Sequence, residues 1–142
     1  MSPPVSRSRR LAWLAVPLGL GTLAAWYLPS VAQQPGDAVS LKAAREAHEA
    51  GRAVLIDIRE PNEHARGVAA GARLLPMSQL KQRLAEIPTD PTVPVLLICN
   101  TQNRSSATLK ALRQQGYTHV RYVDGGMAGW VRLGWPVVPP GP

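Results

Sequence analysis

The sequence predicts an α/β domain with a mostly parallel central sheet and helices on both of its faces. After residue 38, segments with helix caps alternate with short apolar segments, a rhythm typical of parallel sheets with helical crossovers. Two apolar segments, Ala53–Ile58 and Val95–Ile98, show no polar alternation, as expected of strands buried on both faces. A chain of 142 residues has room for one such domain and a short appendage.

The first elements are predicted from their caps. Ser40 is a good N-cap for a helix over Leu41–Ala50, which Gly51 ends. The strand Ala53–Ile58 follows, and a proline just after it suits the first turn of a short helix, Pro61–Arg66.

The second half follows the same rhythm after an irregular, glycine-containing stretch. Ser78 is expected to cap a helix that ends near Glu86, and prolines 88, 91 and 94 then stiffen the loop before the strand Val95–Ile98. The remaining elements are a helix over Ser105–Gln115, a strand over Val120–Val123 and a helix that Gly125-Gly126 opens and that ends near Leu133.

The basic residues do not predict nucleic-acid binding, although the formal charge is +7. Three arginines, Arg7, Arg9 and Arg10, precede the first hydrophobic run. Without them the chain has 13 basic and nine acidic residues, a net charge of +4. The remainder is spread along the chain, which indicates a mildly basic surface.

Residues 1–32 are interpreted as an export signal. The three arginines stand in a segment without acidic residues, and Leu11–Leu28 then contains no charge. Small residues at 30 to 32 suit a signal peptidase, so cleavage after Ala32 is expected. The protein would then be periplasmic.

An uncleaved anchor through residues 11–28 is the alternative, because this uncharged run of 18 residues approaches the length that spans a bilayer. The domain would then face the periplasm from the inner membrane. Arg9-Arg10 also leaves twin-arginine export open. Beyond the leader we expect a linker over 33–38, the domain over 39–138 and a tail over 139–142.

Cys99, the one cysteine of the chain, is the candidate nucleophile. It ends a buried strand, and a polar loop leads from it into the next helix, whose positive end and free N–H groups would stabilise a thiolate or a bound anion. The alternative is that Cys99 is an inert core residue and Arg104 a solvated charge. The candidate binding residues are Asn100, Thr101, Gln102, Asn103, Arg104 and Ser105.

Three segments together resemble the rhodanese-like domains. They are CNTQNRS (Cys99–Ser105), LIDIREPNEH (Leu55–His64) and GGMAGWVRLGWPV (Gly125–Val137), which occur in the family's order. The resemblance covers roughly residues 38 to 138. It implies a sulfurtransferase in which Cys99 takes sulfur from thiosulfate or a persulfide and passes it to cyanide or a thiol, without metal or organic cofactor.

The resemblance also assigns supporting residues. Asp57 and Arg59 match the family's aspartate and arginine after the first strand, where they either brace the site or form a surface ion pair. Trp130 matches a packing residue. Two positions depart from the family: Gln102 stands where glycine is common, so the loop is expected to turn differently, and the segment Gly67–Ala72 lacks the family's histidine.

Two other functions remain open from the sequence. A non-enzymatic module would hold the persulfide for a periplasmic partner protein. A phosphatase or arsenate reductase of similar fold is less favoured, because its loop needs five residues between cysteine and arginine and this chain has four. No metal site is expected, since His48, His64 and His119 lie in separate elements.

Overall fold

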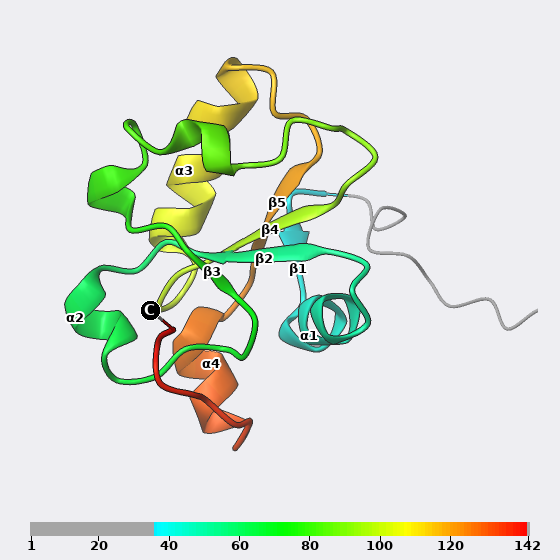
Figure 1. The fold of residues 1–142 in the computed structure, drawn as a ribbon. Helices are drawn as coiled ribbons and strands as arrows, with labels where there is room; N and C mark the ends of the chain where they lie inside the picture. Colours follow the sequence, from blue (N-terminus) through cyan, green and yellow to red (C-terminus); the bar gives the residue numbers. More distant parts are fainter. Residues whose placement is uncertain (1–35, 142) are drawn as a thin grey trace, which may run out of the picture.

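Five parallel strands form one sheet in the order β1-β5-β4-β2-β3 (Figure 1). The computed structural model describes residues 36–141, so the leader expected at residues 1–32 lies outside the described residues. The strands are β1 (Ala38–Val39), β2 (Val54–Asp57), β3 (Arg73–Leu74), β4 (Val95–Ile98) and β5 (Val120–Val123).

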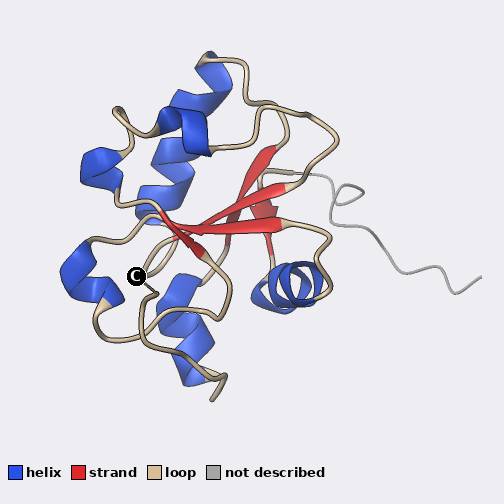
Figure 2. Cartoon of the chain, viewed as in Figure 1, coloured by secondary structure: helices blue, strands red, loops and turns tan. Residues whose placement is uncertain are grey.

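Helices cover both faces of this sheet (Figure 2). The α-helices are α1 (Leu41–Glu49), α2 (Pro61–His64), α3 (Asn103–Gln114) and α4 (Gly126–Arg132), and two short 3-10 helices are η2 (Met77–Gln79) and η3 (Leu84–Glu86). Helices α1 and α4 lie on one side of the sheet, whereas α3 and the 3-10 segments lie on the other. The predicted fold class is confirmed.

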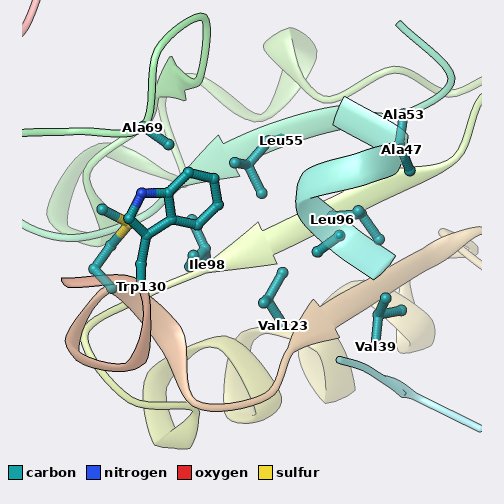
Figure 3. Close-up of a cluster of buried hydrophobic side chains, with 11 residues drawn as sticks. Val39, Ala47, Ala53, Leu55, Ala69, Leu96, Ile98, Val123 and Trp130 are labelled. Atoms are coloured by element: carbon teal, nitrogen blue, oxygen red, sulfur yellow. The ribbon is translucent and has the colours of Figure 1, made fainter. Parts of the chain in front are cut away.

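The central strands alternate their side chains between two cores. Leu96 and Ile98 point toward Ala47 of α1 and Trp130 of α4 (Figure 3), whereas Leu97 packs on the other side with residues of α3. Both sets are almost completely buried. This burial on two faces explains why the strand shows an unbroken apolar run in the sequence.

Local capping explains the first helix. The Ser40 side chain accepts a hydrogen bond from the Ala43 amide at 3.3 Å, as its N-cap position predicts, and Gly51 follows the helix with a positive φ of 68°. The boundary of the expected linker shifts by one residue, because Ala38 already pairs with Tyr122 of β5.

The helix predicted from Ser78 to Glu86 is wrong. The segment forms only η2 and η3, joined by turns. Ser78 does not cap a helix, because both its amide and its hydroxyl donate to the carboxylate of Glu60, at 3.0 and 2.7 Å. The Arg83 guanidinium donates to the Leu74 carbonyl at 3.1 Å in addition to Gln79 and Glu86 within the segment. The sequence signal for the helix was the Ser78 cap, and Glu60 takes both donors of that residue.

Helix α3 begins two residues earlier than predicted. The Gln102 carbonyl already accepts the Ser106 amide at 2.8 Å, which places the start at Asn103. Within residues 36–141, no helix is both long and apolar enough to cross a membrane.

Candidate active site

The predicted nucleophile lies at the carboxyl end of β4, next to the start of α3. The Cys99 side chain is buried, and its Sγ lies 3.4 Å from Oγ of Ser105. The Ser105 hydroxyl also lies 3.1 Å from the Gln102 carbonyl oxygen, to which it can donate. The Ser105 hydroxyl therefore contacts both Cys99 and Gln102.

Backbone hydrogen bonds from α4 hold the loop that follows Cys99. The amides of Met127 and Ala128 donate to the carbonyls of Cys99 and Asn100, both at 2.8 Å. Gly126 makes this contact possible, because a Cβ there would lie 2.2 Å from the Thr101 carbonyl oxygen. The loop conformation thus depends on a glycine 27 positions after the cysteine.

While α4 binds the carbonyls of Cys99 and Asn100, the amides of the loop keep no backbone partner within residues 36–141. Among the described residues, no carbonyl accepts from the backbone N–H groups of Asn100, Thr101 or Gln102. A set of neighbouring free N–H groups at a helix start is a suitable cradle for a thiolate or an anion. The role of these amides in binding an anion stays a prediction.

Arg104, the second residue of α3, is held by a carboxylate to which the sequence pattern assigned no role. Both terminal nitrogens of Arg104 donate to the Glu63 carboxylate at 2.7 Å, and the Glu60 amide donates to the same group at 3.0 Å. The hydrogen bond from Arg104 lowers the pKa of Glu63 to about 2, and it raises the pKa of the Arg104 guanidinium.

Asp57 and Arg59 form a buried ion pair, so the alternative of a surface pair is wrong. The shortest N–O distance is 2.6 Å, and both side chains are almost inaccessible to solvent. The Arg59 guanidinium also donates to the carbonyl of Gly67 at 2.9 Å and approaches that of Glu63 at 3.5 Å. The pair therefore anchors α2 and the following turn, and α2 carries the carboxylate that holds Arg104.

His64 belongs to the same buried cluster. Its Nε2 lies 3.4 Å from Asp57 Oδ1, but it has no hydrogen-bond partner within the described residues. The part of the chain that the structure describes contains no group of three or more His, Cys, Asp or Glu side chains suited to a metal ion.

Comparison with known proteins decides the family. The model of the rhodanese-like domain matches residues 40–133, which include the site and most of the sheet. The chain belongs to the rhodanese-like domain family.

Relatives agree with this assignment. A Bacillus subtilis protein named "Uncharacterized protein YqhL" is 47% identical over 79 residues, which cover 56% of this chain and 61% of that protein. A protein of Allochromatium vinosum named "Sulfurtransferase" is 40% identical over 87 residues, 61% of this chain and 79% of its own length. The match thus spans about three fifths of the first of these relatives.

A solved structure shows the same architecture. The crystal structure of a rhodanese-related protein from Thermoplasma volcanium superposes with a TM-score of 0.65 at 28% identity, covering 74% of this chain and all of that one.

The rhodanese-like loop tolerates the departure at Gln102. Its φ of −149° and ψ of −10° lie outside the left-handed region that favours glycine. The turn instead relies on Gly126 of α4. In the segment that lacks the family's histidine, the Ala70 carbonyl lies 2.8 Å from Nε2 of His48 in α1.

Sequence reasoning about this rhodanese-like domain missed two contributors. Glu63 lies in the segment Leu55–His64, which resembles the family, but no role was predicted for it. Its place three residues after Glu60 is the N3 position of a capping box at the start of α2. Gly126 was seen only as the start of a helix. Neither contact with the loop is visible from local sequence.

Proposed function

We propose that the protein is a sulfurtransferase that carries sulfane sulfur on Cys99. The observation that carries the proposal is the position of this cysteine. It follows a buried strand and enters a loop whose first carbonyls are bound by α4 and whose amides at Asn100, Thr101 and Gln102 have no backbone acceptor in the part of the chain that the structure describes. Membership of the rhodanese-like family and the similarity to a protein named sulfurtransferase support it.

In the loading step, the Cys99 thiolate attacks the outer sulfur of a donor. With thiosulfate, the bond between the two sulfur atoms of the donor breaks, sulfite leaves with the bonding electron pair, and Cys99 becomes a persulfide. The free amides of the loop stabilise the negative charge that the persulfide carries, as they would the thiolate.

In the transfer step, an acceptor attacks the outer sulfur of the Cys99 persulfide. Cyanide forms a bond to that sulfur and leaves as thiocyanate, while the electrons of the broken S–S bond return to Cys99 as thiolate. A thiol acceptor becomes a persulfide in the same way, and its proton passes to the Cys99 thiolate.

The loop length favours sulfur chemistry over phosphoryl chemistry. Four residues separate Cys99 from Arg104, and Arg104 is already engaged by Glu63 rather than directed at a bound oxyanion. A tetrahedral oxyanion such as phosphate needs a wider cradle with a free guanidinium.

Intact mass measurement of the full chain tests the proposal. After incubation with thiosulfate, or with an organic persulfide, we expect a gain of one sulfur atom that a reductant removes and that Cys99→Ser abolishes. No gain with either donor would contradict sulfur transfer. Loading without turnover to thiocyanate or to a thiol persulfide would instead indicate a persulfide carrier that serves a partner protein.

We infer from the sequence of residues 1–32 that the protein is exported. The arginines followed by an uncharged apolar run support a signal peptide or an anchor. Fractionation of cells that express the full chain tests this, because a cleaved form starting at Gln33 belongs in the periplasm and an uncleaved form in the membrane. Recovery from the cytoplasm would contradict export.

A further inference from the structure

The pairing of Arg104 with Glu63 bears on the choice of sulfur donor. We propose that Glu63 is a specificity-determining residue that makes the site favour organic persulfides over the thiosulfate dianion. The inference rests on the proposed sulfurtransferase function and extends it to the class of donor.

The first argument is electrostatic. Both terminal nitrogens of Arg104 are engaged by Glu63 at 2.7 Å, in a bidentate pair that occupies one edge of the guanidinium and balances its charge. A second carboxylate, Glu60, also acts on the Arg104 charge. The local charge beside the loop is therefore near zero or negative.

The neighbouring charges do not restore a positive field. Arg59 is engaged in its buried pair with Asp57, so its charge is balanced as well. A dianion that approaches the loop consequently meets free amides but no unpaired cation among these groups. An organic persulfide carries at most one negative charge at its sulfur. The absence of an unpaired cation among these groups therefore weakens its binding less than that of the dianion.

The second argument is an open apolar groove that begins at Arg104. It has a volume of about 450 Å³ and runs between α3 and the η2 segment. Its walls are Met77, Leu80, Asn103, Arg104, Ala107, Thr108 and Ala111.

The groove continues from the predicted binding loop, because Asn103 and Arg104 belong to both. The paired Arg104 is its one ionised wall residue, so the groove suits an uncharged organic group better than a polar one. We assign it to the carbon substituent of the donor. Inorganic thiosulfate has no such group and gains nothing from this surface.

The loading step for this donor balances without further reactants. The Cys99 thiolate attacks the outer sulfur of R–S–SH, the S–S bond of the donor breaks, and R–S⁻ leaves with the bonding electrons. Cys99 then carries S–SH, and the released thiolate takes a proton from water.

Donor competition in the wild-type chain is the first test. Benzyl persulfide serves as the apolar organic donor and thiosulfate as the dianion, and loading of Cys99 is followed by intact mass. We expect kcat/KM for benzyl persulfide to exceed that for thiosulfate by about tenfold or more. Equal values, with both donors loading Cys99, would overturn the donor preference and leave sulfur transfer intact.

Glu63→Gln tests the residue itself. The amide keeps the size of the side chain and can still accept a hydrogen bond, but it frees the positive charge of Arg104. The ratio of thiosulfate to persulfide kcat/KM should rise about tenfold. An unchanged ratio in a variant that unfolds cooperatively like the wild type would overturn the proposal.

Salt dependence provides a readout that does not require a variant. In the wild-type protein, kcat/KM for thiosulfate should change by less than about twofold between low and high ionic strength, because Arg59 and Arg104, the arginines beside the loop, are each paired with a carboxylate. A steep fall with salt would mean that the site attracts dianions after all and would overturn the electrostatic argument.

Ala107→Trp tests the groove, because Ala107 is an exposed wall residue whose enlargement fills the space. It should lower kcat/KM for benzyl persulfide several-fold more than kcat/KM for thiosulfate. Gln114→Trp is the matched control, since it places the same side chain on an exposed position of α3 outside the groove. Equal effects of both variants on both donors would contradict the assignment of the groove.

Discussion

The Sγ atom of Cys99 and the Oγ atom of Ser105 lie 3.4 Å apart at the start of α3. The same hydroxyl lies 3.1 Å from the Gln102 carbonyl oxygen, so its single proton can be donated either to that oxygen or to the sulfur of Cys99. When Cys99 is a thiol, the thiol can donate to Ser105; when it is a thiolate, the hydroxyl can turn and donate to the sulfur. Ser105 is thus able to serve both forms.

Ser105→Ala should slow the loading of sulfur on Cys99 about tenfold. The reason is the loss of one hydrogen bond to the sulfur in its charged form, which corresponds to about 1.4 kcal/mol. The rate of alkylation by iodoacetamide should fall in parallel. Ser106→Ala is the matched control, because the Ser106 hydroxyl donates to the Asn103 carbonyl and not to Cys99; equal effects of the two variants would contradict the role of Ser105.

Gly126→Ala should abolish sulfur loading and destabilise the fold. Its Cβ would lie 2.2 Å from the Thr101 carbonyl oxygen and 2.5 Å from that of Cys99, so the loop must move. Gly51→Ala is the control for backbone strain without a clash. Gly51 also has a positive φ, but nothing lies within 4 Å of the position that its Cβ would take. Gly51→Ala should cost about 1–2 kcal/mol in urea unfolding and retain loading. Loading by Gly126→Ala at the wild-type rate would show that α4 does not determine the loop.

Removal of one partner of the buried Asp57–Arg59 pair should be strongly destabilising. Arg59→Met leaves a buried carboxylate without its main partner, at a cost of about 3–5 kcal/mol in the free energy of unfolding. The double variant Asp57→Leu, Arg59→Met should cost clearly less than the sum of the two single changes. Additive costs in urea unfolding would mean that the two side chains are not coupled.

Low pH should reduce the free energy of unfolding because it protonates Glu63. Its pKa is about 2 in the folded state and 4.5 as its ordinary value, so its contribution is present above pH 4.5 and is lost as the pH falls toward 2. The shift corresponds to about 3 kcal/mol, which solvent at the partly exposed pair reduces to about 2 kcal/mol.

Urea unfolding at pH 6 and pH 3 measures the contribution of Glu63 to the free energy of unfolding. Roughly half of it should be gone at pH 3, so the wild-type protein should lose about 1 kcal/mol more than Glu63→Gln over this interval. The same loss in both proteins would assign the acid sensitivity to other carboxylates.

The sequence predicted the elements whose signals are local. The strand Val95–Ile98 was placed with its observed bounds, because burial on two faces leaves an unbroken apolar run. The helix over Leu41–Ala50 was found from the hydroxyl of Ser40. The position of Cys99 at a strand end followed from the same patterns.

What escaped prediction depends on contacts between distant segments. Strands β1 and β3 have two residues each, too few to show a period, and exist through pairing with β5 and β2. The pair of Glu63 and Arg104 joins residues 41 positions apart. Likewise, Ser78 has the chemistry of a helix cap, but Glu60 takes both of its donors.

The dependence of the loop on α4 also sets the order in which the site is completed during synthesis. The carbonyls of Cys99 and Asn100 receive their hydrogen bonds from the amides of Met127 and Ala128. A nascent chain that has not yet emerged beyond residue 128 therefore exposes the cysteine without its finished cradle. The reactive centre is among the last parts of the domain to form, and truncation before Met127 would disable it even though every residue from Cys99 to Ser105 is present.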